Sequence, residues 1–97
     1  MALTLLDLHC LNAMCDDYEN IASVMASVRR DTHGNVNEME MRECLVKLKN
    51  NDWVTAYKFN PLSGKFIGKN NLSGDWSSLW FLIADQGRKE LDENWVT

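Results

Sequence analysis

Two histidines and three cysteines are the side chains of this sequence best suited to bind a metal ion or to act as nucleophiles. His9, Cys10 and Cys15 lie close together, whereas His33 and Cys44 lie further along the chain. Their spacing matches no zinc signature, and Cys10 and Cys15 are a turn and a half of helix apart rather than on one face. We therefore predict no metal site and interpret the cysteines as helix-core residues. A redox role for Cys10 or Cys15 would need a basic neighbour, and the sequence provides none.

Three common catalytic motifs are absent from the sequence: a glycine-rich phosphate loop, a nucleophile elbow and the zinc-protease pattern His-Glu-x-x-His. Neither histidine lies near a candidate serine or cysteine motif. We therefore predict that the protein is not an enzyme and that it requires no cofactor.

The composition predicts one domain over residues 1–97. A chain of 97 residues with 45% hydrophobic residues supports a single core. The net charge of −4 by itself argues against a protein built mainly to bind nucleic acid. The charge is unevenly distributed, however. The segment from Lys47 to Lys69 contains five lysines and one aspartate, a net charge of +4, and the remaining residues sum to −8.

The sequence also bears on the compartment. An odd number of cysteines without a Cys-x-x-Cys pair fits a reducing environment. Residues 1–7 contain no basic residue, and Asp7 interrupts their apolar run, so they do not resemble a signal peptide. No segment approaches the roughly 18 apolar residues of a membrane span. We therefore expect a cytoplasmic protein without a membrane partner.

Hydrophobic periodicity predicts three helices in the first half of the chain. The first covers residues 5–15 and begins at Thr4, with Asp7 completing a capping box. Asp16 and Asp17 are expected to cap the second, which ends at residues 32–35. The third begins after Asn37, which is expected to cap it, and ends at residues 50–52. The apolar stripes of the second and third helices are Ile21, Val24, Met25 and Val28, and Met41, Cys44, Leu45 and Leu48.

The residue pattern of the second half of the chain predicts strands followed by one C-terminal helix. Residues 53–59 and 79–83 are rich in β-formers, and residues 65–68 are expected to form a short strand after a turn at 60–64. Val36 is expected to form a short edge strand. Asp85 is expected to cap a helix that runs to about Trp95, in which Gly87 is a weak position.

Three helices, a β-hairpin and a closing helix form the layout of a winged helix. Three segments resemble PadR-like and MarR-like winged-helix regulators: Tyr-Glu-Asn-Ile at 18–21, Leu-Val-Lys-Leu-Lys-Asn-Asn-Asp-Trp-Val at 45–54, and Trp-Phe-Leu-Ile-Ala-Asp-Gln-Gly-Arg at 80–88. Asp52 and Ala84 replace the glycine and threonine of the family pattern, and the long C-terminal helix of PadR proteins is absent. The resemblance implies an α+β winged-helix fold with a three-helix core, a two- to three-stranded β-wing and a C-terminal helix.

The resemblance implies a small transcriptional regulator that binds duplex DNA. The third helix would enter the major groove and the basic wing would contact phosphates. The residues expected at the DNA are Asn37, Met39, Glu40, Arg42, Glu43, Val46 and Lys47 on the third helix, and Lys58, Lys65 and Lys69 on the wing.

The alternative is a winged-helix module that binds protein and not DNA. Glu38, Glu40 and Glu43 lie in the half of the third helix that would face bases, where they would weaken attraction to phosphates. Met39 and Val46, on the side opposite the core stripe, suit either thymine methyls or a protein interface. Trp76 and Trp95 are expected to be exposed at an interface, and a homodimer through the terminal helices is a further expectation.

Overall fold

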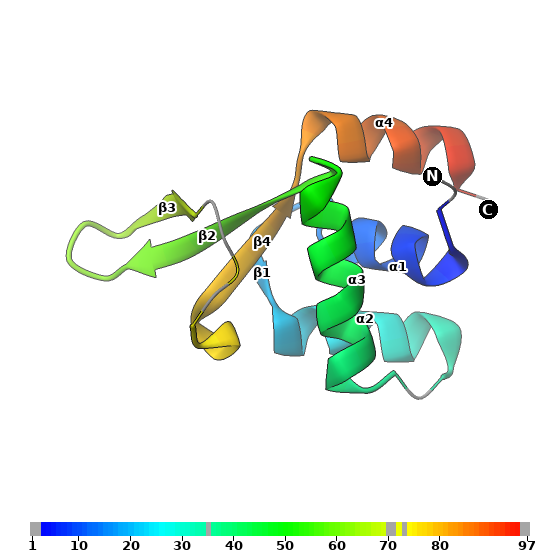
Figure 1. The fold of residues 1–97 in the computed structure, drawn as a ribbon, viewed down its shortest axis with the longest axis horizontal. Helices are drawn as coiled ribbons and strands as arrows, with labels where there is room; N and C mark the ends of the chain where they lie inside the picture. Colours follow the sequence, from blue (N-terminus) through cyan, green and yellow to red (C-terminus); the bar gives the residue numbers. More distant parts are fainter. Residues whose placement is uncertain (1–2, 35, 70–71, 73, 96–97) are drawn as a thin grey trace.

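The computed structural model describes residues 3–34, 36–69, 72 and 74–95, which form an α+β fold (Figure 1). The predicted fold class is therefore confirmed at this level. The elements are α1 (Leu5–Ala13), β1 (Glu19–Asn20), α2 (Ile21–Thr32), α3 (Glu38–Asn50), β2 (Val54–Asn60), β3 (Lys65–Lys69), the 3₁₀ turn η1 (Trp76–Ser78), β4 (Leu79–Ile83) and α4 (Asp85–Asn94).

Capping boxes fix the starts of α1 and α3. Thr4 Oγ1 accepts a hydrogen bond from the Asp7 N–H, and the Asp7 carboxylate accepts one from the Thr4 N–H. Asn37 and Glu40 make the same reciprocal pair at α3. Both predicted caps are therefore confirmed. The predicted end of the first helix is wrong, because α1 ends at Ala13 and Cys15 lies beyond it.

The start of α2 differs from the prediction. Asn20 caps it by accepting a hydrogen bond from the Ser23 N–H, so neither Asp16 nor Asp17 is the cap. The reason is that Glu19 and Asn20 are extended and pair with β4 as β1, which delays the helix until Ile21. This short strand was missing from the sequence prediction.

The described residues between α2 and α3 include His33 and Val36. His33 ends α2 in the left-handed conformation, at φ 53°. Arg29 then donates two hydrogen bonds to the Val36 carbonyl, at 3.0 and 2.6 Å. Val36 is buried in the core and lies outside any strand, so the predicted edge strand at this position is wrong. The arginine holds the Val36 carbonyl that a strand partner would otherwise have bound.

The described strands form an antiparallel sheet in the order β1-β4-β2-β3. The predicted strands at 53–59, 65–68 and 79–83 are confirmed to within one residue at each end. In this order β2 pairs with β4 on one side and with β3 on the other. The β2–β3 hairpin therefore extends to one side of the helices (Figure 1).

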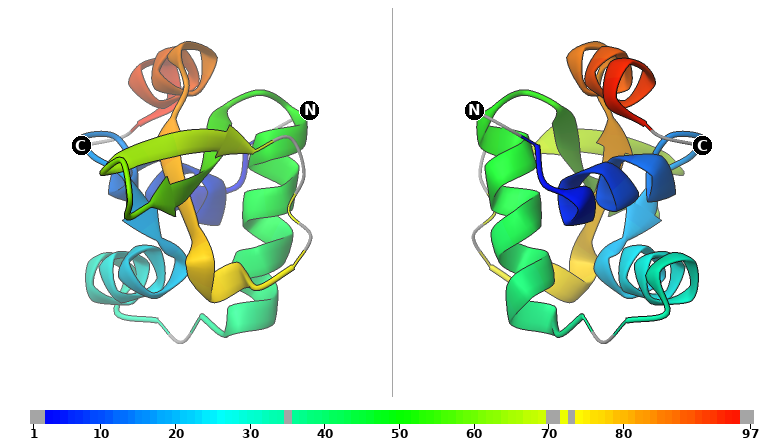
Figure 2. Two further views of the ribbon diagram at one scale, coloured as in Figure 1. Left: turned by 90° about the vertical axis from the view of Figure 1, so that its left-hand side faces the viewer. Right: turned by 90° about the vertical axis from the view of Figure 1, so that its right-hand side faces the viewer.

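The sheet presents one face to the core. Leu79, Phe81 and Ile83 of β4 are buried, while Trp80 and Leu82 between them are only half-buried. Figure 2 shows α2 and α3 on either side of β4, with α4 beyond one end of the strand. The predicted core stripes of α2 and α3 also lie in this core, except that Met25 is half-buried.

The start of α4 depends on Gly87. A Cβ atom at this position would lie 1.9 Å from the Trp53 carbonyl oxygen, which accepts a hydrogen bond from the Ala84 N–H. Gly87 is therefore required for close packing rather than being a weak helical position. Ala84, and not Asp85, occupies the N-cap position, and no side chain caps the helix. Close approach to Trp53 replaces the expected cap.

Within the described residues, every helix is too short or too polar to cross a membrane.

Candidate interaction surfaces

The outward side of α3 combines apolar and acidic side chains. Met39 is 71% exposed and Val46 is 37% exposed, whereas the stripe of Met41, Cys44, Leu45 and Leu48 is buried. The predicted orientation of the helix is therefore confirmed. We call the exposed residues Glu38, Met39, Glu40, Glu43 and Val46 the α3 outer face.

Asn37 and Glu40 have a structural role in addition to their exposure. Asn37 Oδ1 accepts a 2.8 Å hydrogen bond from the Glu40 N–H, and the Glu40 carboxylate lies 3.4 Å from the Asn37 backbone nitrogen. Glu38 and Glu40 in the first turn also face the positive end of the helix dipole. Glu38 and Glu40 therefore stabilise the start of α3 and place two carboxylates in its first turn.

Arg42, which was expected at bases or phosphates, contacts two side chains of its own chain. Its guanidinium lies 3.4 Å from the Glu38 carboxylate and 5.3 Å from the centre of the Trp76 ring. Its Nε is buried without a hydrogen-bond partner. Trp76 is not freely exposed as expected, because its ring packs against Phe81 at 6.1 Å. Arg42 thus packs against Trp76 and Glu38, while its side chain remains 43% exposed.

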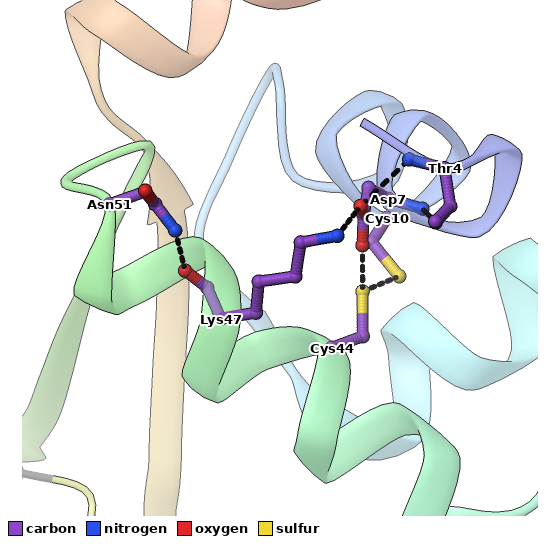
Figure 3. Close-up of polar contacts among 6 residues, drawn as sticks. All are labelled: Thr4, Asp7, Cys10, Cys44, Lys47 and Asn51. Carbon is purple, nitrogen blue, oxygen red and sulfur yellow. Dashed lines mark hydrogen bonds and ion pairs between the residues drawn. The ribbon is translucent and has the colours of Figure 1, made fainter. Parts of the chain in front are cut away.

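Lys47 was also expected at DNA, and it too is paired internally. Its Nζ lies 2.5 Å from Asp7 Oδ2, and the Asp7 side chain is only 3% exposed (Figure 3). Burial alone would raise the pKa of the Asp7 carboxyl, but hydrogen bonds from Lys47, Thr4 and Cys44 outweigh burial and lower the pKa below its ordinary value. The lysine therefore neutralises a buried carboxylate between α1 and α3.

Two thiols complete this buried cluster. Cys44 Sγ lies 3.3 Å from Cys10 Sγ and 3.2 Å from Asp7 Oδ1 (Figure 3). The hydrogen bond with Cys10, burial and the adjacent Asp7 all raise the pKa of the Cys44 thiol, so it remains protonated and unreactive. Cys10 and Cys44 are core residues, as predicted, while Cys15 is half-buried. The part of the chain that the structure describes contains no metal-binding group of three or more His, Cys, Asp or Glu residues.

The second surface is on the β2–β3 hairpin. Lys58 pairs with Ile67 and Asn60 pairs with Lys65 across the two strands, while Ala56 pairs with Lys69. Paired residues share a face, and alternate residues along a strand point to the same side. The three predicted wing lysines therefore lie on one side of the hairpin. We call Lys58, Lys65, Ile67 and Lys69 the hairpin lysine face.

The hairpin lysine face borders a surface cavity of about 580 Å³. Lys58, Pro61, Ile67 and Lys69 line it, together with Phe59, whose ring lies on the opposite face of the hairpin against Phe66. Phe59 is 39% exposed and Ile67 is 53% exposed. The cavity thus combines an apolar lining with positive charge. Ile67 was not among the predicted site residues, although its position two residues after Lys65 in the predicted strand 65–68 places both side chains on one face.

The opposite face of the hairpin is aromatic. Tyr18 stacks on Phe66 with ring centres 3.9 Å apart and planes 9° from parallel. Trp80 meets Phe66 edge-on at 5.5 Å, and Tyr57 meets Tyr18 edge-on at 4.9 Å. These contacts attach the hairpin to the residues before β1 and hold the lysine face at a fixed orientation.

Of the two terminal helices, α1 presents Leu5, which is 68% exposed, whereas the exposed described residues of α4 are polar. Trp95 is half-buried, and His9 meets its ring edge-on at 5.1 Å. The exposed described residues of α4 are Asp85, Gln86, Arg88, Lys89, Asp92, Glu93 and Asn94, all polar. Trp95 closes the core between α1 and α4, so the homodimer predicted through these helices gains no apolar surface from α4.

No family model, no curated protein and no solved structure matches this chain.

Proposed function

We propose that the chain is a winged-helix module that binds another protein through the α3 outer face. The winged-helix assignment is supported by the order of α1, β1, α2 and α3 before β2 and β4, and by the pairing of β1 with β4. In this assignment α3 is the helix that would read DNA, and the β2–β3 hairpin is an enlarged wing.

One observation carries the choice of a protein partner. The two α3 cations assigned to DNA, Arg42 and Lys47, bind carboxylates of the same chain. What α3 presents beside these pairs is Glu40 and Glu43 next to two exposed apolar side chains, Met39 and Val46. Glutamates near a phosphate backbone are repelled, whereas an exposed apolar pair gains free energy when a protein covers it. The surface of α3 therefore suits a protein partner better than duplex DNA.

A photocrosslinking residue at position 39 tests this proposal. We expect it to capture protein in the cells that express the chain, whereas the same residue at exposed position 89 on α4 serves as the control. Adding Glu43→Lys should abolish capture from position 39, because it reverses the central charge of the surface. The proposal would be contradicted if positions 39 and 89 captured equal amounts of protein. It would also be contradicted if Glu43→Lys left the capture from position 39 unchanged.

Duplex DNA is a second candidate partner, favoured by the hairpin lysine face. Lys58 and Lys65 are exposed on the side of the hairpin that also carries Lys69. A regulator of the PadR or MarR type would then touch phosphates with its wing.

A salt series with random duplex DNA tests this second function. If the wing lysines contact phosphates, the log–log slope of affinity against salt is about −0.9 per contact. Lys58→Glu with Lys65→Glu should then weaken binding to every sequence and flatten the slope by about 2. Lys89→Glu on α4 is the charge-matched control. Absence of binding at about 50 mM salt would exclude DNA and leave the protein-binding function standing.

A further inference from the structure

We infer that the partner of the α3 outer face is a second copy of this chain, whose hairpin lysine face receives it. This inference rests on the proposed protein-binding function and names the partner. The inference is supported by two surfaces of one molecule, which have opposite charge and are both partly apolar.

The α3 outer face has the form of a projecting apolar residue surrounded by negative charge. Met39 is 71% exposed, and Glu38 and Glu40 adjoin it in the sequence. Glu43 lies one helical turn further along the same side, followed by Val46. A flexible, polarisable methionine side chain adapts well to an irregular apolar cavity.

The hairpin offers the complementary form. Its cavity of about 580 Å³ has room for a methionine side chain, and Pro61 and Ile67 supply apolar contacts. Lys58 lines the same cavity, and Lys65 is exposed further along the same face. When Met39 of one copy enters the cavity of another, the glutamates beside Met39 meet these lysines. Opposite charges then fix the orientation of the contact.

The two surfaces cannot satisfy each other within one molecule. In Figure 1 the first turn of α3 lies at the lower end of the helix, whereas the hairpin extends sideways from the region of its upper end. The contact must therefore join two molecules. Because it joins unlike surfaces, it is a head-to-tail contact and not a pairing of identical patches.

Charge reversal distinguishes this contact from other modes of association. We expect the wild-type chain to self-associate with a dissociation constant of roughly tens to hundreds of micromolar, as is typical of a small interface. Sedimentation velocity at roughly 50 mM salt measures this association. Glu43→Lys and Lys58→Glu should each weaken association by about tenfold or more, because each places like charges in contact. Glu93→Lys and Lys89→Glu, both on the exposed side of α4, are the matched controls.

Mixing the two disruptive variants gives the decisive result. In the mixture, the lysine introduced on α3 of the Glu43→Lys variant meets the glutamate introduced on the hairpin of the Lys58→Glu variant. The unchanged α3 of the Lys58→Glu variant meets the unchanged hairpin of the Glu43→Lys variant, as in the wild type. Association in the mixture should return to near the wild-type level. A circular-dichroism melt of each variant confirms that it is folded.

Three outcomes overturn the inference. The wild-type chain stays monomeric under these conditions, both single variants associate as strongly as the wild type, or the mixture associates no more strongly than the single variants. The crosslinker at position 39 separates this failure from failure of the proposed function. If the crosslinker captures a different protein and Glu43→Lys abolishes this capture, α3 binds a protein but its partner is not a second copy of the chain. Capture of no protein rejects both.

Discussion

Asp7 shows how one residue can decide what other residues are free to do. Its carboxylate begins α1 as part of a capping box and also binds Lys47 and the Cys44 thiol of α3. A buried carboxylate without these partners would cost several kcal/mol. The lysine is therefore committed to the fold, whereas Arg42, which contacts Glu38 and Trp76, keeps a side chain that is 43% exposed. The proposed protein-binding role of α3 rests on these contacts.

The lowered pKa of Asp7 predicts a specific acid sensitivity. Its charged form stabilises the folded chain above the ordinary pKa of 3.8, and this contribution is lost as the pH falls through the lower pKa of the folded state. The unfolding free energy of Asp7→Asn should therefore fall less steeply than that of the wild type below about pH 4. Urea unfolding at a series of pH values measures the slope. Asp92→Asn, an exposed control on α4, should keep the wild-type slope, and an unchanged slope in Asp7→Asn would refute this account.

At the scale of elements, the contact between α4 and the start of β2 depends on the absence of a side chain at position 87. The Trp53 carbonyl occupies the space where a Cβ would lie. The contact positions α4 directly after β4, although no side chain caps the helix. Close packing here performs the function that a cap performs in α1 and α3.

Gly87→Ala therefore has the opposite effect from the one that helix propensity predicts. Propensity alone would make the substitution stabilising by about 1 kcal/mol. The clash with Trp53 should instead destabilise the chain by about 2–3 kcal/mol. Gly68→Ala is the matched control, since its added Cβ meets no atom within 4 Å. Chemical unfolding of both variants measures the difference, and a stabilised Gly87→Ala would show that α4 can shift freely.

At the scale of the whole molecule, the net charge of −4 divides into surfaces of opposite sign. Strand pairing collects the wing lysines on one side of the hairpin, while the first half of α3 remains acidic. Two separated and complementary surfaces on one chain favour contact between copies at low salt, and screening weakens such a contact as the salt concentration rises. A hairpin occupied by a second copy could not simultaneously lie on DNA, so the two candidate partners of the hairpin would compete.

The sequence by itself determined the elements that depend on neighbours along the chain. The capping box at Thr4, the cap at Asn37, the apolar stripe of α3 and the strand segments are local patterns of hydrogen bonding and periodicity, and the structure contains them. β1 was missed because two residues carry too little pattern, and their pairing depends on Trp80 and Phe81, which are far along the chain.

Only the tertiary structure decided which charged residues remain available. Spacing along α3 placed Lys47 at the edge of an exposed surface, because helical periodicity describes one element and contains no information on Asp7, forty residues away. Burial of that carboxylate makes the ion pair necessary, since an unpaired charge in the core is too costly to retain. In the hairpin the reverse holds, because strand register gathers lysines that the sequence leaves seven and four residues apart. Periodicity determined the elements, whereas the energetic cost of an isolated buried charge on α3 and the strand register of the hairpin determined which charged side chains they present.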